Sequence, residues 1–271
     1  MTQPAPASAY HASDGAAYEV FLGRWTTRLA EALIAFADFP RTGDLLEVGC
    51  GTGSLALAMA RRWPERRIVG IDIAEPYIAY ARARAAAPAP LFDVGDACAL
   101  PYADARFAGA AAQLVLNFVG DPLAALREMR RVVQRGGIVT AAVWDFRGGL
   151  VFQRLFWDTA AGIDPGAAVA RDRLFSGALA LPDGLPALFE RADMAEIARG
   201  SLTIRMDYAD FEDYWRPLLG GQGPVGSYVV TLAPALRARI ETAVRAAYLS
   251  GAVDGPRSLA ATAWAVRARV P

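Results

Sequence analysis

Glu47 stands two residues before the glycine-rich stretch Gly49-x-Gly51-x-Gly53. Of all the residue patterns in the chain, this combination most directly indicates a ligand-binding site. The glycines let the backbone turn sharply from a strand into a helix and let a ligand contact the main chain. Their spacing differs from the Gly-x-Gly-x-x-Gly of dinucleotide sites. A carboxylate at this turn disfavours a pyrophosphate at the N-terminus of the next helix. It suits a ligand with an ammonium, a sulfonium and no phosphate, unless Glu47 is simply a solvated carboxylate at a strand end.

Two aspartates follow the next two expected strands. Asp72 comes after the strand at 68–71, where an acid beside the crevice binds a ribose hydroxyl pair, and Ile73 would lie against the adenine. Asp96 follows the strand at 91–94 and is placed to accept from an adenine amino group, while the Ala97 backbone N–H meets a ring nitrogen. The alternatives are a helix-start acid for Asp72 and a plain turn for Asp96. Their shared position at successive strand ends favours one nucleoside site.

The elements that must position these residues alternate between short apolar strands and helices. The expected strands are 45–48, 68–71, 91–94, 109–116 and 138–144, and the expected helices are 54–63, 75–87 and 123–133, the last with Gly136 at a left-handed cap. This order gives right-handed βαβ units. We therefore expect an α/β, Rossmann-like doubly wound sheet, mainly parallel with an antiparallel last strand, plus helical lid insertions.

The flanking segments have other patterns. Apolar residues recur at helical spacing over 18–39, and residues 146–186 look helical but interrupted. Further helices are expected at 186–192, 211–219 and 234–250, strands at 197–206 and 259–270, and a hinge-like loop at 220–224. The predicted organisation is one domain with an N-terminal tail and cofactor-capping helix (1–40), a cofactor-binding core (41–145), and helical lid elements with closing strands (146–271).

Composition excludes several classes of protein. The 271 residues include 28 basic residues, all of them arginine, and 28 acidic residues, and this neutral balance argues against a nucleic-acid binder. Two cysteines and one histidine predict neither a disulfide framework nor a metal site. No signal peptide stands out, and the longest apolar run falls short of the ~20 residues that span a membrane. We expect a cytoplasmic monomer or homodimer without membrane insertion.

Four stretches together are similar to a known family. They are LLEVGCGTG at 45–53, IVGIDIAEPYIAYAR at 68–82, VGDACALPYADARF at 94–107 and LVLNFVGDPLAALREMRRVVQRGG at 114–137. In this order and spacing the chain resembles the class I S-adenosylmethionine-dependent methyltransferases, specifically the ubiquinone/menaquinone-methylase-like (type 11) group that acts on small molecules. The resemblance implies S-adenosylmethionine as cofactor and S-adenosylhomocysteine as product.

The resemblance also assigns cofactor contacts. Gly49 and Gly51 approach the methionine part, while Gln113 or Leu114, at the end of the fourth strand, lines the sulfonium region. The segment AYEVFLGRW at 17–25 looks like the helix that caps the cofactor in this group. The implied contacts are Tyr18, Arg24, Trp25, Glu47, Gly49, Cys50, Gly51, Asp72, Ile73, Asp96, Ala97, Gln113 and Leu114. Arg24 would pair with the methionine carboxylate.

Catalytic residues are harder to assign. Methyl transfer from a sulfonium is an in-line displacement that relies mainly on proximity and desolvation. His11 and Asp145 are weak candidates for a general base, because His11 lies on a tail-like segment and Asp145 is equally suited to cap the next helix. Trp144 is either a wall of the acceptor pocket or core. Relatives often have a histidine where this chain has Asn117, so their acceptor chemistry is not carried over.

Two other functions remain open at this point. One is a binding or non-methylating member of the same fold, which the poor set of acid and base residues favours. The other is an NAD(P)-dependent oxidoreductase, against which Glu47 and the glycine spacing argue. Most of the aromatic residues beyond position 150 are expected to pack in the core or the lid. Those that flank the glycine-rich hinge would also suit a planar or hydrophobic acceptor under a closing lid.

Overall fold

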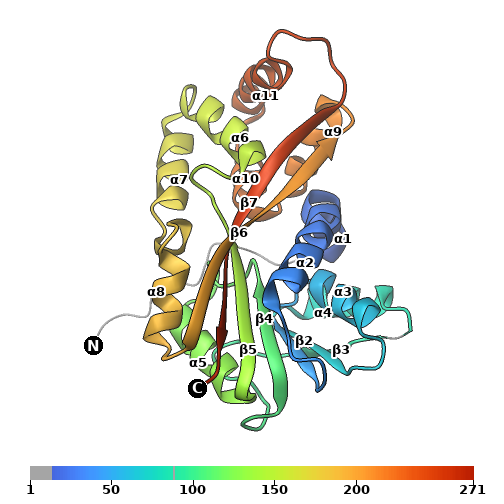
Figure 1. The fold of residues 1–271 in the computed structure, drawn as a ribbon. Helices are drawn as coiled ribbons and strands as arrows, with labels where there is room; N and C mark the ends of the chain where they lie inside the picture. The colour runs from blue at the N-terminus through green and yellow to red at the C-terminus, as the bar shows by residue number, and fades with distance from the viewer. Residues whose placement is uncertain (1–13, 88) are drawn as a thin grey trace.

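A seven-stranded sheet forms the centre of the computed structural model, which describes residues 14–87 and 89–271 (Figure 1). The strand order is β3-β2-β1-β4-β5-β7-β6. The strands are β1 (Leu45–Val48), β2 (Ile68–Asp72), β3 (Leu91–Val94), β4 (Phe107–Gln113), β5 (Val133–Trp144), β6 (Ala195–Tyr208) and β7 (Arg257–Arg269). Strands β1 to β5 pair in parallel, and β7 runs antiparallel to both β5 and β6. The predicted mainly parallel sheet with an antiparallel last strand is confirmed.

Both faces of the sheet are covered by helices and buried. Successive side chains of a strand point to opposite faces, so one strand contributes to two apolar clusters. Leu45 of β1 belongs to one apolar cluster and Leu46 to the other. The first cluster includes side chains of α2 (Arg24–Ala37), α3 (Ser54–Arg62), α4 (Glu75–Arg84) and α6 (Val151–Ala161). The second includes side chains of α5 (Pro122–Val132) and α8 (Gly184–Arg191). Helices on both faces therefore hold the carboxyl ends of β1, β2, β4 and β5 in place.

The N-terminal segment is not the single helix that its periodicity predicts. It divides into α1 (Gly15–Tyr18), a π-helical turn η1 (Glu19–Gly23), and α2, which ends where Asp38 adopts φ 53°. The side chain of Asp14 caps α1 by accepting from the backbone N–H groups of residues 16 and 17. The π-turn contains Phe21 and Leu22, and both side chains are buried. Short π-helical turns are frequent at functional sites.

The second half inserts helices between the last strands. After β5 come α6, α7 (Pro165–Phe175), η2 (Ala178–Ala180) and α8; between β6 and β7 lie α9 (Phe211–Trp215), η3 (Arg216–Gly220), α10 (Gly223–Val229) and α11 (Pro234–Leu249). In Figure 1, β6 and β7 extend beyond the other strands and carry α9 and α11 at their far end. Helix α10 was not expected, because its Gly223 and Gly226 resemble loop residues in the sequence.

Two local predictions are corrected. Strand β4 ends at Gln113 and not at residue 116, because Leu114 adopts φ 62° in the left-handed region. Gly136 does have the expected positive φ of 75°, but α5 ends at Val132 and Gly136 lies within the span of β5, so it does not cap the helix.

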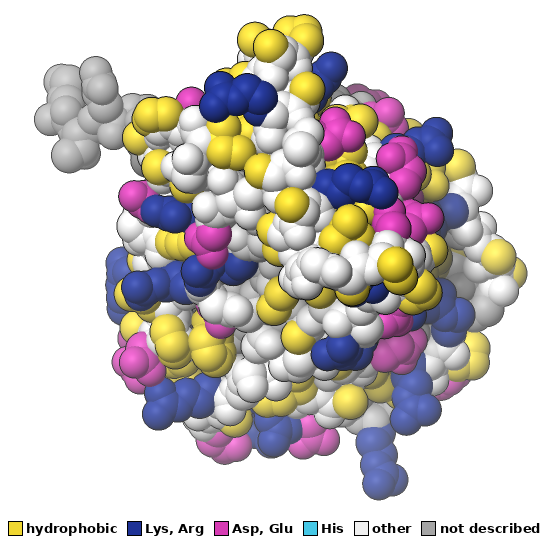
Figure 2. Space-filling model, turned by 90° about the horizontal axis from the view of Figure 1, so that it is seen from above, with side chains coloured by type: hydrophobic (Ala, Val, Ile, Leu, Met, Phe, Trp, Pro, Cys, Tyr) yellow, Lys and Arg dark blue, Asp and Glu magenta, His cyan; other side chains and the backbone are white. Residues whose placement is uncertain are grey.

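The described part of the chain contains no helix long and apolar enough to cross a membrane. On the face shown in Figure 2, arginine side chains alternate with acidic ones, and apolar side chains lie scattered between them.

Candidate functional site

A cavity of about 540 Å³ lies where the carboxyl ends of β1, β2, β4 and β5 meet the N-terminal segment and α6. This is where open α/β sheets bind ligands. The structure brings most of the predicted contacts together in its wall: Tyr18, Glu47, Gly49, Cys50, Gly51, Asp72, Ile73, Asp96, Ala97, Gln113 and Leu114. Further segments, distant in the sequence, complete the wall.

The glycine turn between β1 and α3 is held by main-chain hydrogen bonds. Gly49 and Gly51 adopt φ of 69° and 52°, which favours glycine at both positions. The N–H of Gly49 donates to the Ile71 carbonyl oxygen at 2.8 Å. A Cβ on Gly49 would lie 2.3 Å from Val115. The turn therefore requires glycine for its conformation and for the space that the loop after β4 leaves.

Glu47 is buried, with 2% of its surface exposed, so it is not a solvated strand-end carboxylate. Its Oε2 accepts from the backbone N–H of Ala56, in the first turn of α3, at 2.6 Å. Burial raises the pKa of Glu47 well above its usual value, the Ala56 bond lowers it, and the neighbouring Asp72 raises it again. The carboxylate thus occupies the positive end of α3, where a pyrophosphate would otherwise bind.

Asp72, at the end of β2, ties the glycine turn to the start of α4. Its Oδ2 accepts from the N–H of Gly51 and its Oδ1 from the N–H of Ala74, both at 2.8 Å. Burial raises the pKa of this carboxyl, and the backbone bonds oppose the shift. Each carboxylate oxygen keeps a second lone pair for a ligand. Next to it, Ile73 lines the cavity with 72% of its surface exposed, an unusual position for a large apolar residue that a ligand would cover.

Asp96 lies on the exposed rim of the cavity after β3. Its Oδ1 accepts from the N–H of Cys98 at 2.8 Å, so Asp96 does stabilise a turn. The bond uses one acceptor position of the carboxylate and orients the rest of the group. Both predicted roles of Asp96 are therefore compatible with one conformation.

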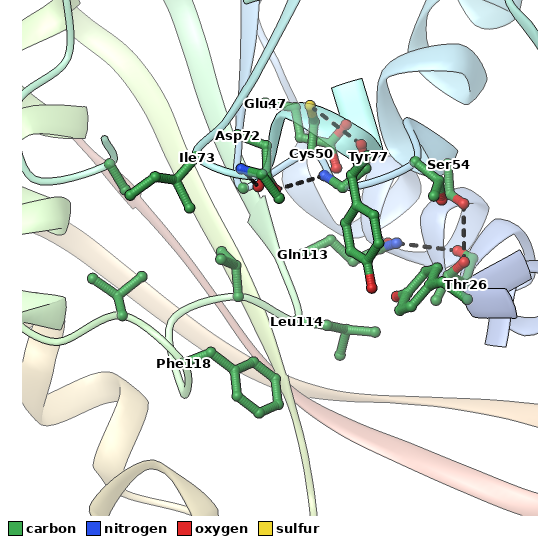
Figure 3. A pocket seen from close by; sticks show the side chains of 18 of the residues that line it. Thr26, Glu47, Cys50, Ser54, Asp72, Ile73, Tyr77, Gln113, Leu114 and Phe118 are labelled. Atoms are coloured by element: carbon green, nitrogen blue, oxygen red, sulfur yellow. Dashed lines mark hydrogen bonds between the residues drawn. The ribbon is translucent and has the colours of Figure 1, made fainter. Parts of the chain in front are cut away.

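Gln113 ends β4 inside the cavity and is 8% exposed. Its Nε2 donates to the Thr26 carbonyl oxygen at 3.1 Å, and the Thr26 hydroxyl lies 2.9 Å from that of Ser54 (Figure 3). The Gln113 Oε1 is buried and has no hydrogen-bond partner among the described residues. Because a buried, unpartnered acceptor is costly, this oxygen is suited to a ligand with N–H or O–H groups.

The N-terminal segment covers one end of the cavity and is fastened to the glycine turn. Glu19 Oε1 accepts from the Thr52 hydroxyl at 2.5 Å and pairs with Arg84 at 2.5 Å. The ring of Tyr18 lies 5.4 Å from that of Tyr77, whose hydroxyl donates to Gln222 Oε1 at 3.0 Å. The chain segments before β1 and before α10 therefore meet over the cavity.

Arg24 and Trp25 are not brought to the cavity, which corrects the expectation that they line it. The guanidinium of Arg24 forms two hydrogen bonds with Asp213, at 2.9 and 3.2 Å, and lies over the Trp25 ring at 4.2 Å. The Trp25 ring is buried against Tyr208. The π-turn at 19–23 changes the register, so that Phe21 and Leu22 line the cavity instead.

Of the two weak candidates for a general base, only Asp145 lies among the described residues. Asp145 does not line the cavity; its Oδ1 accepts from the N–H groups of Arg147 and Gly148 at 3.0 Å, in a turn before α6. His11 lies outside the described residues. Cys50 lines the cavity, and burial raises the pKa of its thiol, so it is a packed thiol.

The far side of the cavity consists of residues that the sequence marked weakly. Trp144 lines the cavity and is also buried in the core; its role as a wall of the acceptor pocket stays a prediction. Sequence reasoning missed Phe118, Phe146, Gln153, Gly223 and Pro224. The position after a strand end was a usable signal for the first two, the hinge-like loop expected at 220–224 contains Gly223 and Pro224, and nothing local marks Gln153. The later aromatics Phe156 and Trp215 pack against each other, as expected of core or lid residues.

Comparisons with known proteins agree with this geometry. Residues 46–141 match the family model described as a methyltransferase domain. Demethylmenaquinone methyltransferase from Roseiflexus castenholzii is 36% identical over 108 residues, which are 40% of this chain and 45% of that protein. A malonyl-[acyl-carrier protein] O-methyltransferase from Xylella fastidiosa is 34% identical over 119 residues, 43% of this chain and 40% of that protein. The matched segments span less than half of these relatives.

Similar solved structures extend over nearly the whole chain. Phosphoethanolamine N-methyltransferase 2 from Haemonchus contortus, solved with S-adenosyl-L-methionine, has a TM-score of 0.58 and is 14% identical to this chain. The matched region is 95% of this chain and 56% of the Haemonchus chain. The [4+2]-cyclase SpnF has a TM-score of 0.52 and is 22% identical; the matched region is 98% of this chain and 88% of the cyclase chain. At these identities the likeness concerns the fold.

Proposed function

We propose that this chain, which carries a methyltransferase domain over residues 46–141, binds S-adenosylmethionine in the described cavity and transfers its methyl group to a small molecule. The observation that carries the proposal is the buried Glu47 carboxylate on the first turn of α3. It takes the place of a phosphate and favours a cationic ligand.

The cavity residues fit the parts of this cofactor. Asp72 would bind the ribose hydroxyls, and Asp96 with the Ala97 N–H would bind adenine beside Ile73. The unpartnered Oε1 of Gln113 would accept from the ammonium of the methionine part, and Leu114 would line the sulfonium region. Glycine at 51, where a Cβ would meet nothing nearer than Tyr77 at 3.8 Å, leaves the main chain open to a ligand.

When bound, the cofactor supplies a methyl group on a sulfonium, and an acceptor atom displaces the sulfur in line. The protein's own contribution is to orient the two molecules and to exclude water. Phe21, Leu22 and Tyr18 cover the site from the N-terminal side, and Gly223, which packs against Phe21, extends this cover together with Pro224. We therefore assign residues 15–40 as a cap and the helices inserted after residue 146 as a lid on the core at 41–145.

A non-methylating use of the same cofactor is the second candidate. It is favoured by the titratable wall residues, which are acids, tyrosines and cysteines, with no histidine or arginine among the described ones. The similarity to a [4+2]-cyclase agrees with this possibility at the level of fold.

Calorimetry with three ligands tests the cofactor assignment. We expect S-adenosylmethionine and S-adenosylhomocysteine to bind at micromolar or lower concentration and NAD⁺ to bind at least about 100-fold more weakly. Tight binding of NAD⁺ alone would refute the proposal. The reaction itself is followed as release of S-adenosylhomocysteine on addition of a metabolite extract; tight cofactor binding without turnover across many acceptors would favour the non-methylating candidate.

A further inference from the structure

The cavity has a second half that the proposed cofactor contacts do not use. It lies toward β5 and α6 and is lined by Phe118, Trp144, Phe146 and Gln153. The cofactor contacts belong to the ends of β3, β2, β1 and β4, which are consecutive neighbours in the sheet and lead up to β5. An acceptor therefore has to reach the cofactor from this aromatic half.

Gln153 is the polar exception in this half. It lies in the first turn of α6, is 2% exposed, and its Oε1 has no hydrogen-bond partner among the described residues. Gln113 has a similar orphan oxygen, but it ends β4, and the proposed function uses it for the methionine part. Buried hydrogen-bond acceptors nearly always have a partner in folded proteins. The Gln153 oxygen is therefore suited to an O–H or N–H group on the molecule that accepts the methyl group.

The charges of the wall restrict the acceptor further. The cavity is lined by the carboxylates of Glu47, Asp72, Asp96 and Asp121. None of its described residues is an arginine or a histidine, and the chain has no lysine. A carboxylate or phosphate group on the acceptor would enter this cavity without a counter-charge and against four acids, which is unfavourable.

We infer that the acceptor is an uncharged, flat, apolar molecule with one hydroxyl or N–H donor, and that this donor binds Gln153 Oε1. The inference rests on the proposed function, because it presupposes the cofactor in the other half. Flat rings suit the aromatic walls formed by Phe118, Trp144 and Phe146, and the single polar group fixes the orientation of the ring plane. Gln153 is thus an acceptor-binding residue that positions the reacting group.

Three naphthalenes test the class of acceptor by calorimetry on protein saturated with S-adenosylhomocysteine. 2-Naphthol carries the donor, 2-methoxynaphthalene lacks it, and 6-hydroxy-2-naphthoate adds a negative charge. We expect 2-naphthol to bind, and each of the other two to bind about 10-fold more weakly or worse. Equal binding of the naphthoate, or no binding of any of the three, overturns the inference. Failure of S-adenosylhomocysteine to bind would instead refute the proposed function.

Variants of Gln153 test the residue. In Gln153→Leu we expect 2-naphthol to bind about 5- to 30-fold more weakly, with 2-methoxynaphthalene and S-adenosylhomocysteine unaffected and the Tm not lowered. Gln153→Met serves the same purpose should the leucine variant fail to fold, and Gln134→Leu, at an exposed position of β5, is the matched control. Equal losses for naphthol and its methyl ether would show a packing role and overturn the assignment.

Discussion

The two halves of the cavity are built in opposite ways. The donor half, formed by residues 47–53, 72–74 and 95–98, consists of short turns directly after β1, β2 and β3. The acceptor half, formed by Phe118, Trp144, Phe146, Gln153 and residues 223–224, draws on segments more than 100 residues apart. The first is rich in carboxylates fixed by backbone N–H groups, and the second is aromatic.

This difference separates two tasks. In the donor half the acids are already oriented by the main chain, as Asp72 is by Gly51 and Ala74, so a ligand meets a preformed site. In the acceptor half a single amide oxygen, that of Gln153, lacks a partner. On the proposed function, specificity for the donor depends on local turns, whereas specificity for the acceptor depends on how the inserted helices pack.

The largest loss of stability and cofactor binding is expected from Gly49→Ala, which alters the glycine turn of the donor half. The left-handed φ costs about 1–2 kcal/mol for a residue with a Cβ, and the clash with Val115 adds about 1–3 kcal/mol. We expect a large loss of unfolding free energy and of cofactor binding. Gly136→Ala is the matched control, because Gly136 has φ 75° but no atom within 4 Å of a Cβ, so only the backbone cost should appear in denaturant unfolding.

Next in size is the loss of the carboxylates of the donor half. Asp72→Ala should weaken S-adenosylmethionine binding about 10- to 100-fold and lower the Tm, because two backbone donors also lose their partner. Asp96→Ala should weaken binding about 10-fold with little change in Tm, since Asp96 lies on the exposed rim. Unchanged affinity of both folded variants by calorimetry would remove the nucleoside site from this half.

Glu47→Gln is expected to have a smaller, pH-dependent effect. Because the folded-state pKa of Glu47 is raised, the folded protein holds this proton where the unfolded chain has lost it. Stability without ligand should therefore fall as pH rises from about 4.5 through the folded-state pKa. Cofactor affinity should rise over the same range, since the ionised carboxylate attracts a cation.

The glutamine variant should flatten both pH profiles and weaken binding about 10-fold at neutral pH. Thermal unfolding and calorimetry at several pH values measure the two profiles. A binding profile identical to that of the unchanged protein would mean that Glu47 acts only as a cap of α3.

The smallest effect is expected from Arg24→Ala. The Arg24–Asp213 pair is 40% and 29% exposed at its two side chains, and such pairs contribute less than about 1 kcal/mol. Cofactor affinity should change by less than about twofold, because Arg24 does not line the cavity. A loss of tenfold or more by calorimetry would return Arg24 to the donor half.

The two halves also differed in how far they could be predicted. Glu47, Asp72 and Asp96 line the cavity as their motifs indicate, because each acid lies within two residues of the carboxyl end of its strand. Arg24 and Trp25 do not line the cavity. A π-turn of five residues precedes them, and periodicity does not reveal such a turn. Leu114 was placed in a strand, since a leucine with φ 62° leaves no trace in composition.

Strand and turn chemistry along the chain was enough to predict a doubly wound α/β sheet, mainly parallel with an antiparallel last strand, and the row of acids at one edge. Both depend on interactions between residues close in sequence, such as glycine conformations and strand-end carboxylates. The packing of distant segments decided which face of the N-terminal segment covers the cavity, that Glu47 is buried on α3, and that Gln153 faces the ligand space. Burial and an unpartnered oxygen arise when separate elements come together, so no local pattern encodes them.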